Sequence, residues 1–410
     1  MKSRHAAPGV DDAQGLRLDD LDYDLPAELV AQHPVEPRDA SRLLVCRRGE
    51  GTIADRVFAE LPGLLRAGDV LVRNDTRVFP ARAFFRRATG GRIGALFLRP
   101  AAEGMAGAAG AGAAGPAAAG SGDPAEMWEV LLRGRPRPGE TLTSEALGEG
   151  WPLVAVRPYG DGRWLVTSRG ARSVLELLEE AGVTPLPPYI HEALDDPERY
   201  QTTYARLVGS AAAPTAGLHF TPVLDAALAA AGVTIESVTL HVGLGTFKPL
   251  QEETLAADHL HSETYAVDAA VWARLLAARA QGRRVVAVGT TSVRTLEHLA
   301  RTAPEAAAPA GPPEAAAPAG PPEAAAPAGP PEAAAPAGPL AYRGETSLFI
   351  TPGCEFRVVD AIVTNFHLPR TSLLALVMAF CGVAQTRRVY AHAVRERYRF
   401  YSFGDAMLAL

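Results

Sequence analysis

The hydrophobic pattern changes along the chain, and this change constrains the fold more than any other feature of the sequence. From Asp69 to Ser168, short apolar stretches such as DVLVRND, RIGALFLRP and MWEVLLRG are separated by turn residues. That spacing predicts antiparallel strands forming a small β-barrel. After Ser168, helical stretches alternate with apolar strands, as in TPVLDAALAAAG followed by VTIESVTLHVG. Such alternation predicts an α/β fold with a mixed or parallel sheet flanked by helices.

Two early segments, LPAELVAQHP and SRLLVCRR, also fit the second pattern. We therefore expect an α/β main domain formed by residues 22–68 and 169–410, with the antiparallel β-barrel inserted at 69–168. Residues 1–21 are polar and are expected to be a disordered tail. Without tail and inserts, about 330 residues remain to fold, which exceeds the usual range of a single core.

Two segments have compositions that cannot form a core. Residues 304–339 are four identical copies of the nonapeptide PEAAAPAGP. Its prolines break helices and it has no large apolar residue, so we expect an extended, solvated insert. Residues 101–123 are rich in Gly and Ala and predict a flexible loop between two strands of the barrel.

Charge gives a local rather than a global indication of a nucleic acid partner. The chain has 46 acidic and 40 basic residues, a net charge of −6. Residues 70–168, by contrast, contain 12 arginines, no lysine and nine acidic residues, a net charge of +3. The stretch ARAFFRRATGGR is the richest in arginine, and a polyanion could dock there. The candidate contacts are Arg82, Arg86, Arg87 and Arg92.

Cysteine usage and hydropathy indicate a cytoplasmic protein, which we expect to be a monomer without membrane contact. Cys46, Cys354 and Cys381 are far apart and form no CxxC pair, which argues against a disulfide framework. The polar N-terminal stretch lacks the features of a signal peptide. The longest apolar run, LLALVMAFCGVA at 373–384, has 12 residues and predicts a buried helix. A membrane span needs about 20.

The segment VVAVGTTSVRTLEHLA at 285–300 predicts a buried strand, a tight turn at Gly289 and a helix capped by a Thr or Ser. Free N–H groups at such a helix start can bind a carboxylate or phosphate, with Thr290 and Thr291 beside them. An ordinary strand-to-helix connection is the alternative, because Thr and Ser are common caps. Arg294 opposes the helix dipole, which favours a binding role for this cation.

Several polar residues stand in loop-like surroundings rich in Pro and Gly. His219 lies in APTAGLHF at 213–220, while Asn365 and His367 lie in NFHLPRTS at 365–372. Crowding of this kind indicates a shaped loop, although each histidine alone is more often structural. His241 begins HVGLGTF, whose GxG pair lacks the third glycine of a dinucleotide fingerprint.

Other patterns are ambiguous or absent. Asp75 and Arg77 belong to NDTRVFPAR, where the carboxylate either binds a ligand or bonds turn amides. His259, His261 and Glu263 in DHLHSE have a spacing that could hold a metal, but no second ligand cluster accompanies them and we expect no metal. The sequence contains no GxSxG, HExxH or P-loop pattern, which argues against those enzyme classes.

Taken together, the ordered motifs resemble the S-adenosylmethionine:tRNA ribosyltransferase-isomerases of queuosine biosynthesis. The resemblance extends from Asp22 to Leu410, which makes coincidence remote. It rests on YDLPAELVAQHP, RDASRLLV, GDVLVRNDTRVFPAR, PLPPYI, ERYQTTYAR, AAPTAGLHFTP, TLHVGLGTFKP, HSETY, VVAVGTTSVRTLE, RVVDAIVTNFHLPRTSLL and ERYRFYSFGDAML.

The resemblance implies transfer and isomerisation of the ribosyl moiety of S-adenosylmethionine onto 7-aminomethyl-7-deazaguanine at the tRNA wobble position. Epoxyqueuosine forms, and adenine and methionine are released. S-adenosylmethionine is then a consumed co-substrate, and we expect no resident cofactor. The partner is tRNA carrying the deazaguanine precursor. The family's α/β domain with an inserted β-barrel agrees with the two hydrophobic patterns.

This reaction gives the candidate residues provisional roles. The sulfonium acidifies the adjacent C5′ proton, so a positioned base is needed, and imidazole suits that task. His219, His241 and His367 form the pool for acid and base work. Thr290, Thr291 and Arg294 would hold the methionine carboxylate or a phosphate. Contacts to ribose or base edges are expected from the substrate-binding residues Asp75, Arg77 and Asn365.

Two other functions stay open at this stage. An S-adenosylmethionine-dependent RNA methyltransferase would leave S-adenosylhomocysteine instead of adenine and methionine. A non-enzymatic RNA-binding module is disfavoured by the acidic total and by the lack of aromatic RNA-binding motifs.

Overall fold

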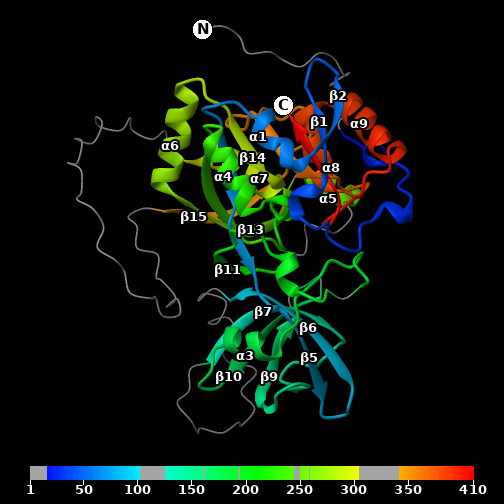
Figure 1. Ribbon diagram of the computed structural model, residues 1–410. Helices are drawn as coiled ribbons and strands as arrows, with labels where there is room; N and C mark the ends of the chain where they lie inside the picture. The colour runs from blue at the N-terminus through cyan, green and yellow to red at the C-terminus, as the bar shows by residue number, and fades with distance from the viewer. Residues whose placement is uncertain are drawn as a thin grey trace, which may run out of the picture.

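A computed structural model describes residues 16–410 except 102–124, 159, 161, 193, 244–249, 258 and 304–340. Figure 1 shows a helix-and-sheet body containing both ends of the described chain and, below it, a separate barrel. The α/β fold with an inserted antiparallel barrel is thus confirmed. The predicted loop at 101–123, apart from Ala101, and the repeats at 304–339 lie outside the described residues.

The main body is built on a nine-stranded mixed sheet. Neighbouring strands follow the order β15-β13-β12-β3-β14-β16-β17-β1-β2. The centre is parallel, from β12 through β3 and β14 to β16, and antiparallel pairs form both edges. The strands are β1 (Arg42–Cys46), β2 (Ile53–Val57), β3 (Val70–Asn74), β12 (Thr234–Leu240), β13 (His259–Asp268), β14 (Val285–Val288), β15 (Ala341–Leu348), β16 (Ala361–Asn365) and β17 (Ala406–Ala409).

Helices cover both faces of this sheet because successive side chains of a strand point to opposite sides. In β14, Val285 and Ala287 join one core, whereas Val286 and Val288 join the other. Helices α6 to α9 pack on the first face, and α1 and α4 pack on the second. The helices are α1 (Leu61–Leu64), α3 (Val174–Ala181), α4 (Pro222–Ala230), α5 (Glu252–Ala257), α6 (Ala269–Ala280), α7 (Gly289–Thr302), α8 (Ser372–Cys381) and α9 (Val383–Arg395).

The barrel is closed in the order β10-β7-β6-β5-β8-β9. Its interior is aromatic, with the Trp151 ring centroid 5.1 Å from that of Phe85 and 5.5 Å from that of Phe97. A capping box at Ser173 starts α3, which packs its apolar side on the barrel core. The strands are β5 (Arg82–Arg87), β6 (Arg92–Pro100), β7 (Ala125–Arg133), β8 (Thr141–Ser144), β9 (Gly148–Pro158) and β10 (Arg163–Arg169).

Two expected boundaries differ from the structure. The barrel begins at Arg82 rather than Asp69, because β3 lies in the middle of the nine-stranded sheet. A short apolar run such as DVLVRND reads the same in either setting, so the pattern alone could not separate them. The tail predicted at 1–21 is structured at its end. Leu18–Leu21 forms a 3-10 turn, and Leu21 is buried and accepts a hydrogen bond from the Arg370 backbone at 2.9 Å.

The apolar run near the C-terminus forms the predicted buried helix, α8. Within the described residues, no single helix is both long and apolar enough to cross a membrane. Helices α8 and α9 together have the length and apolar composition of a membrane span, but the chain bends by 115° between them.

Candidate active site

A cleft opens where β14 and β16 end, the position at which open α/β sheets usually bind ligands. It consists of two hollows with open volumes of about 340 and 360 Å³. One extends toward aromatic residues and the other toward the start of α7. The two hollows share four lining residues, Thr215, Asn365, His367 and Leu373.

Helix α7 begins without a side-chain cap. Gly289 has φ +82°, a value suited to glycine, and this lets the helix start directly after β14. The N-cap residue is Val288, which provides no capping hydrogen bond. Thr290 and Thr291 therefore line the cleft inside the first turn, not at the expected cap. Ser292 also lies inside that turn, and its hydroxyl donates to the Val288 carbonyl at 2.7 Å.

A buried hydrogen-bonded chain runs behind the cleft through Asn365, His219 and Ser41. The Asn365 Nδ2 group donates to the Tyr401 carbonyl at 3.0 Å, which fixes the orientation of the amide. The same nitrogen lies 3.3 Å from His219 Nε2, which must accept. His219 Nδ1 therefore carries the proton and donates to Ser41 Oγ at 2.7 Å. Both ring nitrogens of His219 are thus used within the protein.

The electrostatics of His367, in the cleft, and of His219, behind it, favour neutral rings. Burial, with a smaller contribution from Arg399, lowers the pKa of His219 to about 3. Its ring also stacks on Phe58 with 4.8 Å between centroids. Burial alone lowers the pKa of His367 to about 3. His367 Nε2 lies 2.8 Å from Thr364 Oγ1, so this ring is also held in place.

These lowered pKa values predict a pH dependence of stability. Between about pH 3 and the ordinary histidine pKa near 6.5, the unfolded chain binds protons that the native protein excludes. The free energy of unfolding should therefore fall as pH drops below about 6.5, by up to about 1.4 kcal/mol per pH unit for each buried ring. Denaturant titrations from pH 4 to 7 should give His219→Gln a shallower slope than wild type. His191→Gln, at an exposed position, is the control, and equal slopes for both variants would contradict the prediction.

His241 belongs to a neighbouring polar cluster after β12. Its Nδ1 lies 2.8 Å from Thr76 Oγ1, and burial lowers its pKa while Asp75 opposes that shift. Asp75 is buried and accepts hydrogen bonds from Thr239 Oγ1 at 2.7 Å and Arg206 Nη2 at 2.8 Å. The residue after His241, Val242, lines the cleft, which places this cluster next to it.

Arg294 is engaged inside the protein and does not line the cleft hollows. It is buried in an ion pair with Glu263 and also donates through Nε to the Leu348 carbonyl at 3.1 Å. Glu263 in turn accepts from the Gly243 backbone at 3.0 Å. This geometry favours a role in holding β13, β15 and the backbone at Gly243 rather than in binding a carboxylate.

The arginines predicted to meet tRNA lie on the barrel, away from the cleft. Arg87 forms a bidentate ion pair with Glu140, in which Nε and Nη2 donate to the two carboxylate oxygens at 2.7 and 2.9 Å. Arg86 and Arg92 share Glu145. Arg82 is partly buried, and burial followed by Arg133 lowers its pKa. Arg77, a candidate for substrate binding, lines neither hollow of the cleft and forms an ion pair with Glu198 at 2.5 Å.

The predicted metal pattern is only partly within view. The side chains of His259 and His261 lie outside the described residues, and Glu263 is paired with Arg294. Across the part of the chain that is described, no group of three His, Cys, Asp or Glu residues has an arrangement suited to a metal.

Sequence reasoning missed the aromatic wall of the cleft. Tyr189 and Tyr401 line the first hollow with ring centroids 4.6 Å apart, and Tyr189 Oη lies 2.7 Å from Ser402 Oγ. Thr215 was also missed, although it lies inside APTAGLHF. The signals were present in the motifs PLPPYI and RFYSFGD, but no side-chain type in them singles out a ligand contact.

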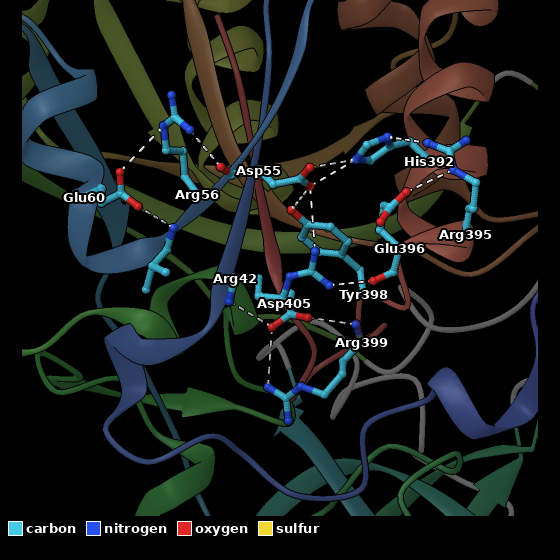
Figure 2. Close-up of polar contacts among 11 residues, drawn as sticks. Arg42, Asp55, Arg56, Glu60, His392, Arg395, Glu396, Tyr398, Arg399 and Asp405 are labelled. Carbon is cyan, nitrogen blue, oxygen red and sulfur yellow. Dashed lines mark hydrogen bonds and ion pairs between the residues drawn. The ribbon is translucent and has the colours of Figure 1, made fainter.

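A polar network braces the chain that carries Tyr401 and Ser402. Asp405 accepts from the backbone nitrogens of Arg42 at 3.0 Å and Arg399 at 2.8 Å (Figure 2). Beside it, Asp55 accepts from Tyr398 Oη at 2.5 Å and contacts His392 Nε2 at 3.0 Å (Figure 2). Through Asp405 the network holds both ends of the segment 399–405. It thereby positions the side chains of Tyr401 and Ser402 in the cleft.

The fold and cleft define an α/β protein with a barrel insertion and a ligand cleft at the carboxyl ends of its strands. The chain matches the family described as queuosine biosynthesis protein over residues 18–409 and belongs to that family.

The chain is also similar to proteins named S-adenosylmethionine:tRNA ribosyltransferase-isomerase. The protein of that name from Rubrobacter xylanophilus is 46% identical over 96% of this chain and 98% of its own length. The one from Symbiobacterium thermophilum is 45% identical over 96% of this chain and 100% of its own length. A crystal structure of S-adenosylmethionine tRNA ribosyltransferase from Thermotoga maritima is 34% identical, covers 95% of this chain and 100% of its own, and has a TM-score of 0.48.

Proposed function

We propose that this protein is an S-adenosylmethionine:tRNA ribosyltransferase-isomerase. It transfers and isomerises the ribosyl moiety of S-adenosylmethionine onto 7-aminomethyl-7-deazaguanine at the tRNA wobble position. Epoxyqueuosine forms, and adenine and methionine are released. The observation that carries this proposal is the full-length similarity to relatives of that name. Consistent with it, residues from several of the motifs, among them PLPPYI, AAPTAGLHFTP and VVAVGTTSVRTLE, line one cleft.

The cleft and the residues beside it offer groups for proton transfer and for positioning the substrate. Of the three candidate histidines, His367 is the one that lines both hollows, where its neutral ring can reach a bound substrate. His219 holds Asn365 in place and so acts as a positioning residue. His241, beside Asp75, is the candidate for proton transfer at the edge of the cleft. S-adenosylmethionine is a consumed co-substrate, and the proposal requires no resident cofactor.

The direct test is a product assay. Purified protein is incubated with S-adenosylmethionine and tRNA bearing the deazaguanine precursor, and nucleosides and small products are analysed by mass spectrometry. We expect epoxyqueuosine, adenine and methionine in equal amounts. S-adenosylhomocysteine with a methylated nucleoside would instead establish a methyltransferase. Binding of tRNA without any turnover would favour an RNA-binding module.

We further propose that the arginine-rich stretch of the barrel docks the tRNA backbone. Arg86→Glu combined with Arg87→Glu is expected to weaken tRNA binding about tenfold or more at low salt. It should also reduce the slope of log affinity against log salt by about two, one for each lost phosphate contact. Arg395→Glu combined with Arg397→Glu, at exposed positions of the main body, is the matched charge reversal. Equal salt slopes for the two double variants would overturn the docking surface.

A further inference from the structure

One polar atom at the cleft has no partner in the protein. Asn365 is 2% exposed, and its Oδ1 forms no hydrogen bond with any described residue. Buried polar groups are nearly always satisfied, so an orphan acceptor at a cleft needs an explanation. The amide cannot be reversed to relieve it, because Nδ2 is held by the Tyr401 carbonyl and His219 Nε2. Oδ1 is therefore an acceptor of fixed orientation that can accept a hydrogen bond from an N–H or O–H group of a ligand.

The same cleft carries groups of the opposite character. The start of α7 lines the second hollow with Gly289, Thr290 and Thr291, and its N-cap residue provides no side-chain acceptor. N–H groups at the start of a helix carry partial positive charge and bind carboxylates. Asn365 lines this hollow too. One hollow thus contains a fixed acceptor and a set of anion-binding donors.

We propose that this hollow binds the α-amino-acid end of S-adenosylmethionine. The carboxylate accepts hydrogen bonds from the first turn of α7, and the α-ammonium donates to Asn365 Oδ1. This inference rests on the proposed function and assigns a subsite within it. Asn365 is then a substrate-binding residue that reads the ammonium group, and His219 holds its amide in register.

The lining of the two hollows distinguishes this placement from one with adenine at Asn365. An adenine amine could also donate to Oδ1, but adenine favours aromatic neighbours. The aromatic residues Tyr189, Phe366 and Tyr401 line the first hollow. Apart from Asn365 and the His367 ring, which belong to both hollows, the hollow at α7 is lined by aliphatic and hydroxyl side chains, and these suit a methionine chain. They include Ala213, Pro214, Ala216, Val242 and Thr364.

The first test varies the ligand and uses the wild-type protein. Affinities are measured by calorimetry for S-adenosylmethionine, its deaminated analogue, its decarboxylated analogue and 5′-methylthioadenosine, which lacks the amino-acid end. Removing the ammonium or the carboxylate is expected to weaken binding by about 10- to 100-fold each, the value of one charge-assisted contact. Equal affinity for the parent compound and the deaminated analogue would overturn the proposal, whereas the product assay independently tests the reaction.

The second test varies Asn365. Asn365→Leu should weaken binding of methionine and S-adenosylmethionine by about 10- to 100-fold. Binding of 5′-methylthioadenosine should be unchanged, and this serves as the internal control for folding. The variant should also bind the deaminated analogue as well as wild type does, because the lost contact is already absent. Loss of 5′-methylthioadenosine binding with methionine binding intact would show that the amide reads adenine instead.

Discussion

Replacing Glu263 with leucine is expected to lower the free energy of unfolding by about 3–5 kcal/mol. Glu263 and Arg294 form an ion pair with exposed fractions of only 4% and 3%. Removing the carboxylate leaves a guanidinium in the core without its counter-charge. The Gly243 backbone also loses its acceptor. Denaturant unfolding measured at neutral pH should detect the loss.

The matched control removes both charges. Replacing a buried ion pair with apolar residues of similar volume is often neutral or stabilising, so Glu263→Leu combined with Arg294→Met should recover most of the stability. The double variant also tests the role of Arg294. Retained affinity for S-adenosylmethionine would agree with a structural role, whereas a loss of binding in a stable double variant would restore Arg294 as a ligand for the carboxylate. A wild-type stability for Glu263→Leu alone would contradict the prediction.

Arg294 illustrates which features of the site a local sequence pattern records. Its position in the first turn of a helix was visible, and a cation there needed an explanation. The explanation is Glu263, which lies 31 positions earlier on β13, the strand next to the edge strand β15. Pairing between distant residues depends on strand order, which no local pattern encodes. The same holds for Asn365 and Thr290, which line one hollow because β14 and β16 are parallel neighbours in the sheet.

The fold could be predicted from the sequence better than the site, because hydrophobic periodicity records which faces of helices and strands are buried. Alternation of helices and apolar strands predicted the main sheet, and short strands with turns predicted the barrel. The strand Val70–Asn74 was assigned to the wrong unit, since its run of apolar residues fits both. The histidines illustrate the remaining gap. His219 was singled out by its motif, but only geometry shows that both its ring nitrogens are occupied.

Replacing Gly217, in the motif APTAGLHF, with alanine is expected to lower both stability and turnover. A Cβ atom at Gly217 would lie 2.1 Å from Tyr204 Oη and 2.8 Å from Thr202 Cγ2. Tyr204 has little room to retreat, because the Arg73 guanidinium stacks over its ring at 3.7 Å. Overpacking of this kind costs about 1–3 kcal/mol. The strain would displace the turn that carries Thr215, and a shift of about 1 Å at a reacting site can lower turnover about 100-fold.

A second substitution separates this steric effect from a loss of chemistry. Tyr204 Oη is buried without a hydrogen-bond partner among the described residues, so Tyr204→Phe alone should be neutral or slightly stabilising. Combined with Gly217→Ala, it removes the closest contact and should restore part of the stability and turnover. Recovery stays partial because Thr202 Cγ2 still crowds the new methyl group. Stability is measured by denaturant unfolding and turnover by adenine release. Full activity of Gly217→Ala, or a double variant no better than the single one, would show that glycine is not required there to make room for Tyr204.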